Sequence, residues 1–181
     1  DLFPHREDFA WVASGGQTGA QPDTTSHPFP YVGYYIMRSG WEPDANYLAF
    51  DAGPLGHGHI HQDKLNLVVW AYGREILFDS GGGSYDKSEW RSYAVDTFSH
   101  NTVLIDWKPQ RRRTPYAWKT FTVHGKPVRR WCRDREKNVS RSPIDAHWQS
   151  QSAFDYVAGV YDEGYGEEED RMATHTRRVL F

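Results

Sequence analysis

The chain has 181 residues, a formal net charge of −3 at pH 7 and many aromatic residues, with 8 Trp, 11 Tyr and 9 Phe. This length suits one domain with its own hydrophobic core, and no apolar run is long enough for a membrane-spanning helix. The single cysteine, Cys132, excludes an internal disulfide, and the opening residues DLFPHREDF lack the basic and apolar regions of a signal peptide.

Residues 1–29 come first and, with their prolines and the stretch GGQTGAQPDTTS, predict an extended linker. Runs of β-branched and aromatic residues then predict strands at 30–38, 46–52, 65–72, 75–79, 102–107, 117–123, 127–132, within 146–161, and at 172–181. Gly73-Arg74 and Gly125-Lys126 predict hairpin turns, whereas residues 88–95 allow either one helical turn or irregular structure. Strands at this spacing, with no convincing amphipathic helix, predict an all-β fold built as a sandwich of antiparallel sheets.

The charges are distributed unevenly along the chain. Twelve of the 21 Lys and Arg residues lie between Lys108 and Arg141, against only Asp134 and Glu136, and the acidic counterpart is DEGYGEEED at 162–170. The basic stretch suits a polyanion such as a uronic-acid polysaccharide or a nucleic acid. A solvated pair of strands balanced by the acidic loop explains the same pattern, and both interpretations stay open.

The stretch GHGHIHQD at 56–63 contains three histidines at alternate positions, followed by Asp63 and an apolar strand. If a strand begins near Gly58, then His59, His61 and Asp63 share one face. Histidines in a glycine-rich turn are also common as solvated loop residues. Two later motifs, FDSG with Asp79 and SHNT with His100, complete a set of two nitrogens and one oxygen with His61. Three protein ligands with an open position are typical of a catalytic zinc site.

These motifs resemble the heparinase II/III-like family of polysaccharide lyases. The resemblance rests on GHIHQDKLNLVVWAYGREILFDSGGGSY followed by WRSYAVDTFSHNTVLID, and YYIMRSGWEPDANYLAFDAGP upstream fits the same family. It covers residues 34–107 well, and the combination of HxHxD, FDSG and SHNTV is specific. It implies an antiparallel β-sandwich, supersandwich-like, that follows an α/α-toroid in a longer enzyme. Residues 30–181 are then expected to be the sandwich domain, truncated at its C-terminus.

The resemblance also implies roles for individual residues. His59 corresponds to a substrate-cleft histidine, and His61, Asp79 and His100 correspond to the ligands of a zinc ion. Some members add a catalytic tyrosine from the following loop, for which Tyr85 and Tyr93 are the alternatives. Other residues are expected around this site: Asp63 as support for a ligand histidine or as a cap of the loop, Asn101 as further support, and Arg111, Arg112 and Arg113 as contacts to substrate.

The implied reaction is β-elimination in a uronic-acid-containing polysaccharide of the heparan sulfate or alginate kind. A base removes the C5 proton and the C4 oxygen leaves, while cations and hydrogen-bond donors stabilise the enediolate. His59 suits that task or a shared proton transfer with a tyrosine. We expect zinc chiefly to fix the loop that carries His59. Because the family's catalytic tyrosine and its partners lie on the toroid, this chain alone is expected to be inactive.

The expected partners are therefore an acidic polysaccharide and the N-terminal toroid, with no nucleic acid, and the expected location is periplasmic or secreted. Two other classes of protein remain as alternatives. A cupin-type metal enzyme also carries HxH on a strand, but it has a glutamate where this chain has Leu65 and Asn66. A non-catalytic carbohydrate-binding module would use exposed tryptophans for stacking. The candidates for such stacking, or else for core packing, are Trp41, Trp70, Trp90 and Trp107.

Overall fold

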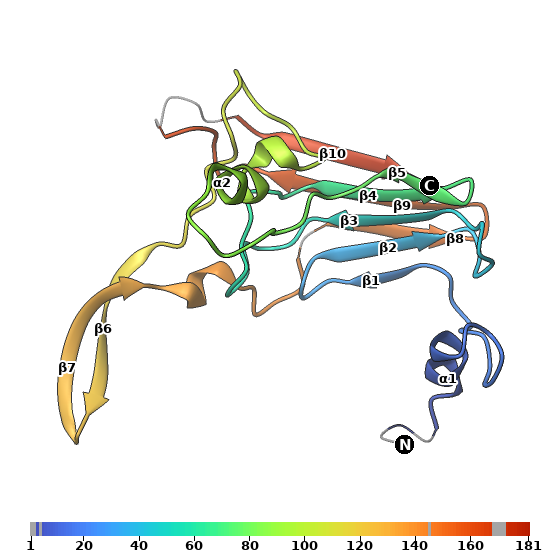
Figure 1. The fold of residues 1–181 in the computed structure, drawn as a ribbon, viewed down its shortest axis with the longest axis horizontal. Helices are drawn as coiled ribbons and strands as arrows, with labels where there is room; N and C mark the ends of the chain where they lie inside the picture. The colour runs from blue at the N-terminus through green and yellow to red at the C-terminus, as the bar shows by residue number, and fades with distance from the viewer. Residues whose placement is uncertain (1–2, 4, 145, 168–172) are drawn as a thin grey trace.

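The computed structural model describes residues 3, 5–144, 146–167 and 173–181. The described elements, in chain order, are α1 (Glu7–Ala13), β1 (His27–Phe29), β2 (Tyr34–Arg38), β3 (Tyr47–Asp51), β4 (Asn66–Ala71), β5 (Arg74–Leu77), α2 (Glu89–Val95), the 3-10 helix η1 (Thr97–Ser99), β6 (Tyr116–Val123), β7 (Lys126–Arg133), the 3-10 helix η2 (Arg135–Asn138), β8 (His147–Gln151), β9 (Phe154–Tyr161) and β10 (His175–Leu180). Figure 1 shows their arrangement. Among these residues, neither helix is long and apolar enough to cross a membrane.

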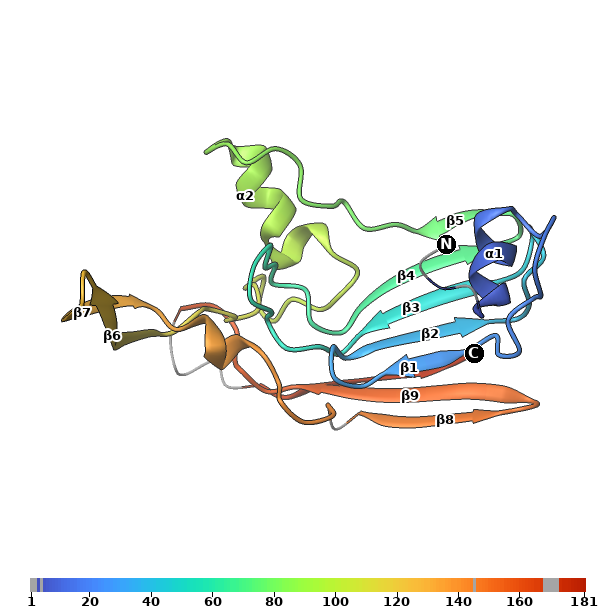
Figure 2. The same ribbon diagram turned by 90° about the horizontal axis from the view of Figure 1, so that it is seen from below.

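Two antiparallel sheets form the body of the molecule. One has five strands in the order β1-β2-β3-β4-β5, and the other has three in the order β10-β9-β8. Figure 2 shows the two sheets as stacked layers, with β1 to β5 lying over β8 and β9. All strand pairs in both sheets are antiparallel. The predicted all-β antiparallel sandwich is confirmed.

The core lies between the layers because alternate side chains of each strand point inward. The buried apolar residues come from both sheets and their connections: Tyr35, Met37, Leu48, Phe50, Ala52, Leu65, Val157, Tyr161, Tyr165 and Val179. Gly159 on β9 packs closely against residues of the other layer, since a Cβ atom there would be 2.6 Å from Cδ2 of Leu65 and 3.0 Å from Cβ of Ala52. The packing therefore leaves no room for a side chain at this position.

The N-terminal segment differs from the expected extended linker in two places. Residues 7–13 form α1, which has Glu7 and Asp8 in its first turn, where acidic side chains stabilise a helix. Its Trp11 packs edge-on against Trp41, with ring centroids 5.8 Å apart. Residues 27–29 form β1 at the edge of the larger sheet, a position that tolerates a proline. Both elements are short and lie among glycines and prolines, so the composition of the segment predicted an extended linker instead.

Both predicted hairpins are confirmed, with each turn one residue earlier than expected. The turns are Tyr72-Gly73, with φ of 55° and 70°, and His124-Gly125, with φ of 48° and 75°. Two consecutive positive φ values characterise the turn that joins closely paired antiparallel strands. Residues 88–95, left open by the sequence, form α2 with Ser88 as its cap.

The predicted strand at 102–107 is wrong. Asp106 and Trp107 have positive φ values of 51° and 59°, which reverse the chain, and only an isolated bridge joins Ile105 to Lys108. The side chain of Thr102 donates to the backbone oxygen of Lys64 at 2.8 Å. A side-chain hydrogen bond is therefore found here where backbone hydrogen bonds between strands were expected.

The C-terminal predictions hold with adjusted limits. Residues 146–161 contain two strands, β8 and β9, and the last strand begins at His175. Met172, at the start of the predicted final strand, lies outside the described residues, as do 168–170 of the acidic stretch.

The two ends of the sandwich differ. At one end, α2 and the loops after β3 and β5 gather, and the β6–β7 hairpin projects away from the body there (Figure 1). At the other end lies α1. The candidate site residues lie at the end that carries α2 and the hairpin.

Candidate functional site

The histidine-containing loop spans residues 56–64, between β3 and β4, and is not a strand. Distant segments hold its backbone: Gly56 N donates to Asn138 O at 2.8 Å, and Gln62 N donates to Val95 O at 3.0 Å. His59 has a positive φ of 55°. The expected strand alternation over 58–63 is therefore wrong, and the histidines of this loop point to different neighbours.

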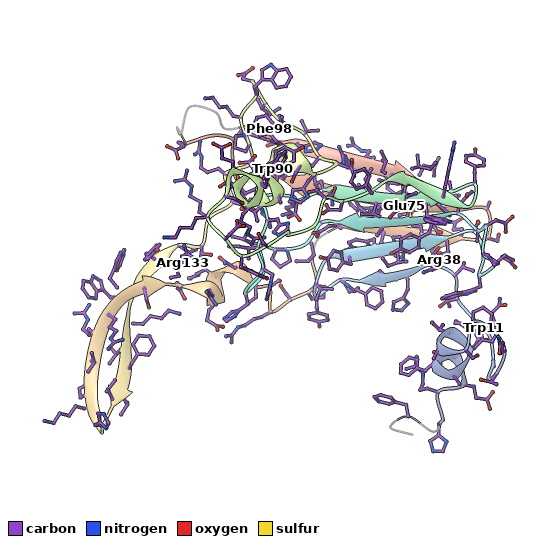
Figure 3. All side chains as sticks on the ribbon, viewed as in Figure 1. Trp11, Arg38, Glu75, Trp90, Phe98 and Arg133 are labelled. Atoms are coloured by element: carbon purple, nitrogen blue, oxygen red, sulfur yellow. The ribbon has the colours of Figure 1, made fainter. Side chains whose placement is uncertain are left out.

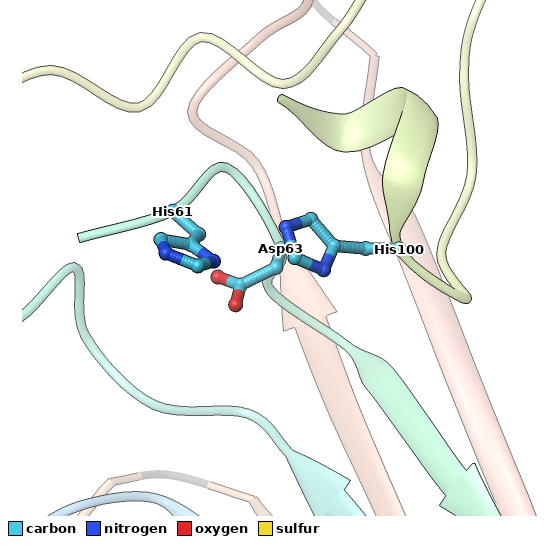
Figure 4. A group of neighbouring side chains, drawn as sticks. All are labelled: His61, Asp63 and His100. Atoms are coloured by element: carbon cyan, nitrogen blue, oxygen red, sulfur yellow. The ribbon is translucent and has the colours of Figure 1, made fainter. Parts of the chain in front are cut away.

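His61, Asp63 and His100 form one cluster. Their nitrogen and carboxylate ligand atoms all lie within 4.8 Å of one another, and Figure 4 shows the three side chains directed toward each other. The His61 and His100 rings are 5.2 Å apart between centroids. The His100 ring is buried, and its Nε2 atom has no hydrogen-bond partner among the described residues. A buried nitrogen without a partner is costly, so this atom is available for a ligand.

Asp79 contacts the cluster through His100. Its Oδ2 atom lies 2.7 Å from His100 Nδ1 and accepts a hydrogen bond from Asn66 Nδ2 at 2.7 Å. Burial alone would raise the Asp79 pKa, but hydrogen bonds from His100, Gly81 and Asn66 outweigh it and lower the pKa to about 2. The resulting carboxylate favours a proton on His100 Nδ1, and the neutral ring then has Nε2 as its metal-binding atom, the usual arrangement of a metal-binding histidine.

The zinc-ligand set stays a prediction. Two of its members, His61 and His100, lie together, but the carboxylate beside both rings belongs to Asp63, while Asp79 occupies the supporting position on His100. The sequence expectation gave these two aspartates the opposite roles. Among the described contacts, Asp79 reaches His100 through Nδ1, and Asp63 is the carboxylate grouped with both imidazoles.

His59 and Tyr85 form a second group at the mouth of the site. The Tyr85 hydroxyl and His59 Nδ1 share a hydrogen bond, and their rings meet edge-on with centroids 5.6 Å apart. The Arg91 guanidinium lies 4.8 Å from the Tyr85 ring centroid and donates to Gly82 O. Of the two tyrosines that the sequence left open, Tyr85 is the one brought to His59, whereas Tyr93 lies half exposed on α2.

A pocket of about 520 Å³ connects these groups to solvent. It is lined by residues of β2, β3, the histidine loop and the segment after η2: Tyr31, Val32, Tyr34, Asp51, Pro54 to His61, Asp63, Val139 and Ser140. Burial, together with the charge of Asp63, raises the pKa of Asp51 to about 7. The volume lies in the range of ordinary ligand pockets.

The three predicted substrate arginines occupy different environments. Arg111 donates to the backbone oxygens of Gly166 and Tyr165, at 2.8 and 3.1 Å. Arg112 is buried, with Nη1 3.8 Å from Asp63 Oδ1, and it offsets the negative charge of the cluster from inside the fold. A substrate role for these residues stays a prediction.

Arg113 is exposed and pairs with Glu167 at 2.9 Å. Among the three arginines it is the one that lies at the surface.

Asn66 is a site residue that the sequence interpretation missed. It is 7% exposed, and besides its bond to Asp79 it accepts a hydrogen bond from the backbone N of Asn101 at 2.8 Å. The Asn101 side chain donates to Leu67 O and Phe78 O, at 2.9 and 2.8 Å. A supporting role of Asn101 stays a prediction. The available signal for Asn66 was an amide at the start of an otherwise apolar strand.

Comparison with known proteins gives a consistent result. A family model described as heparinase II/III-like, C-terminal, matches residues 21–181. A heparin-sulfate lyase of Bacteroides stercoris is 30% identical over 111 residues, which are 59% of this chain and 17% of that protein. An alginate lyase of Stenotrophomonas maltophilia is 29% identical over 100 residues, 49% of this chain and 13% of that protein. The chain thus spans less than a fifth of the curated relatives' length.

Solved structures agree on the fold. A heparinase III, the BT4657 gene product, superimposes with a TM-score of 0.71 at 24% identity, over 99% of this chain and 24% of that one. Heparan sulfate lyase HepC from Pedobacter heparinus gives a TM-score of 0.67 at 19% identity, with the same coverage. Since the family model matches most of the residues, the chain belongs to the heparinase II/III-like C-terminal family.

Proposed function

We propose that this chain is the metal-holding β-sandwich domain of a polysaccharide lyase that cleaves a uronic-acid-containing polysaccharide, of the heparan sulfate or alginate kind, by β-elimination. The family supports the reaction class, and the names of the curated relatives support an acidic polysaccharide. The observation that carries the proposal is the hydrogen-bonded pair of His59 and Tyr85 beside a pocket that also contains His61 and Asp63. The proposed partner domain is an N-terminal α/α-toroid, and the proposed location is periplasmic or secreted.

The reaction requires two proton transfers. The C5–H bond breaks, a C4–C5 double bond forms, and the C4–O bond breaks as its oxygen takes up a proton. Tyr85 and His59 suit a part in these transfers, beside the catalytic tyrosine expected on the toroid, because a phenolate or neutral imidazole accepts a proton and a phenol or imidazolium donates one. Their shared hydrogen bond lets a proton pass between them. The Arg91 guanidinium above the Tyr85 ring adds positive charge where negative charge develops.

The cluster suits zinc by the chemistry of its donors. Two imidazoles and one carboxylate are a common catalytic set for this ion, and the buried Nε2 atom of His100 has no partner among the described residues. We assign His61 and His100 as two ligands and, on the family resemblance, Asp79 as the third, which requires Asp79 to leave its hydrogen bond to His100 Nδ1. Asp63 is the competing carboxylate. Bound zinc would supply positive charge and hold the loop that carries His59.

The direct test is an assay of heparan sulfate and alginate with the complete protein that contains this chain, following the ultraviolet absorbance of the unsaturated uronate. We expect product from one of them, and a loss of about 100-fold or more in His59→Ala and Tyr85→Phe, since general acid–base groups contribute that much. Tyr93→Phe, which removes the matched hydroxyl on α2, should leave the rate unchanged. Absence of unsaturated product from both polysaccharides would contradict the proposal.

A further inference from the structure

The β6–β7 hairpin projects from the body at the end of the sandwich that carries the site (Figure 1). Its register places Tyr116 opposite Arg133, Trp118 opposite Trp131, and Thr120 opposite Arg129. Residues that face each other across a ladder lie on the same side of a hairpin, as do residues two apart along a strand. These six residues therefore share one side, here called the aromatic face. Figure 3 labels Arg133 at the base of the hairpin and shows side chains on both sides of the ribbon.

The rings of the aromatic face are exposed. Tyr116, Trp118 and Trp131 are 51%, 60% and 56% accessible to solvent. Trp131 lies between the other two, stacked on Tyr116 with centroids 6.2 Å apart and tilted against Trp118 at 5.7 Å. The three rings form a continuous row along the hairpin. Large apolar groups gathered on an exposed surface mark an interaction site.

The charge of the hairpin indicates what binds there. Residues 116–133 contain five Lys and Arg residues, and no Asp or Glu: Lys119, Lys126, Arg129, Arg130 and Arg133. On the aromatic face, Arg129 lies over the Trp118 ring at 5.2 Å, and Arg133 Nε donates to the Tyr116 hydroxyl at 3.3 Å. On the opposite side, Lys119 pairs with Asp134 at 2.6 Å. Arg129 thus lies over one face of the Trp118 ring, and Arg133 lies at the hydroxyl of Tyr116.

A surface with both exposed aromatic rings and arginines favours a polymeric ligand whose units are rings with C–H faces and carry regularly spaced anionic groups. Tryptophan and tyrosine offer flat apolar surfaces with a polar edge, and arginine binds carboxylate or sulfate through two parallel hydrogen bonds. An apolar protein partner would leave the positive charges unpaired. A neutral glycan would use the rings and not the arginines. An acidic polysaccharide uses both.

The base of the hairpin is attached to the histidine loop. Strand β7 leads into η2, where Asn138 O accepts from Gly56 N at 2.8 Å and Glu136 lies 3.7 Å from His57 Nε2. The next residues, Val139 and Ser140, line the pocket. The 3-10 helix η2 therefore joins the hairpin to the segment that lines the pocket.

We propose that the aromatic face of the β6–β7 hairpin is a second binding surface for acidic polysaccharide, with sugar rings stacked on Trp118, Trp131 and Tyr116 and anionic groups paired with Arg129 and Arg133. The identity of the ligand rests on the proposed function. The surface holds the polymer outside the reacting centre, so it determines affinity for long chains and takes no part in proton transfer. These tryptophans differ from the four that the sequence suggested for stacking.

The test is titration of the purified chain with heparan sulfate and alginate oligosaccharides, measured by calorimetry. Removing both rings in Trp118→Ala/Trp131→Ala should weaken binding about tenfold or more, as expected for paired aromatic anchors. Arg129→Gln/Arg133→Gln should weaken binding and also reduce its salt dependence. The matched control, Phe121→Ala/Lys126→Gln, removes one ring and one charge from the opposite side and should leave the affinity unchanged.

A measurement on the unmodified chain tests the proposal even if the variants do not fold. The indole N–H signals of Trp118 and Trp131 should shift in NMR spectra as acidic oligosaccharide is added, and should stay in place with a neutral glucan oligosaccharide. Equal shifts with both glycans, or none with the acidic one, would overturn the inference. So would a smaller particle mass for the ring variant in sedimentation, because the face would then join two copies of the chain.

The outcome is separable from that of the proposed function. Cleavage by the complete protein combined with unchanged affinity of the hairpin variants rejects the hairpin surface alone. Absence of cleavage combined with a tenfold loss of affinity in the ring variant rejects the lyase and retains the surface, as part of a carbohydrate-binding module.

Discussion

Asn66 connects two parts of the site, and its replacement by alanine tests whether that connection matters. The side chain donates to Asp79 Oδ2 at 2.7 Å and accepts from Asn101 N at 2.8 Å, in a position that is 7% exposed. Asn66→Ala removes both bonds. It leaves the partly buried backbone N–H of Asn101 without its acceptor and the Asp79 carboxylate with one donor fewer.

The expected cost follows from the two bonds. A hydrogen bond to a charged group contributes about 1.5–3 kcal/mol and a neutral one about 0.5–1.5 kcal/mol, so the free energy of unfolding should fall by about 2–4.5 kcal/mol. Urea unfolding with a chelator present measures this as a lower midpoint at unchanged slope. Zinc affinity should also fall about 10- to 100-fold, because Asp79 would orient His100 less firmly.

The matched control is Asn46→Ala, an exposed asparagine directly before β3. It should change the free energy of unfolding by less than about 0.5 kcal/mol. If Asn66→Ala behaved like this control in both assays, the reasoning that Asn66 supports the site would be refuted.

Two further predictions concern the core and the pocket. Gly159→Ala should lower the free energy of unfolding, measured in urea, by about 1–3 kcal/mol, because the new methyl group would lie 2.6 Å from Leu65 Cδ2. The control Val160→Ala, at the more exposed neighbouring residue, should lower it only slightly. Equal decreases in the two variants would argue against close approach of the sheets at Gly159. Burial and the nearby Asp63 raise the pKa of Asp51 to about 7, above the value of about 3.9 in an unfolded chain, so the folded state binds the extra proton. The free energy of unfolding of the metal-free chain should therefore fall as pH rises from about 4 to about 7, and Asp51→Asn should remove most of this slope; an unchanged slope in the variant would assign it to other groups.

The sequence was informative where structure is local. The hairpins β4–β5 and β6–β7 follow from alternating residues on either side of a glycine, and the turns Tyr72-Gly73 and His124-Gly125 moved by only one position. Strand pairs joined by two residues have few alternative arrangements, so pattern and turn chemistry suffice.

The histidine loop was less predictable because distant residues determine its path. Gln110, almost fully buried, accepts from Lys64 N at 2.9 Å and donates to Lys64 O at 2.8 Å, across 46 positions of sequence. These long-range bonds take the place of the backbone hydrogen bonds of a strand, and the loop contains a positive φ at His59. The spacing of His59, His61 and Asp63 therefore indicated which residues take part, and not which way each one points.

The residues around the histidine cluster were only partly predictable from the sequence. Motif resemblance identified Asp79 and His100, yet Asn66 and Arg112 carry no motif and were placed by packing. Arg112 shows the limit clearly: three consecutive arginines suggest a surface patch, but the middle one is buried against Asp63. Burial of an arginine depends on a carboxylate that is distant in sequence and is recognised only in the folded chain.

The central claim is that this domain holds a metal at the junction of the histidine loop and the SHN segment. Elemental analysis of the purified chain tests it most directly, together with His61→Ala, His100→Ala, Asp63→Asn and Asp79→Asn. We predict near-stoichiometric zinc in the wild-type chain, its loss in both histidine variants, and a larger loss in Asp79→Asn than in Asp63→Asn if the family assignment of the third ligand holds. A wild-type chain that is folded and metal-free after dialysis against zinc would contradict the account.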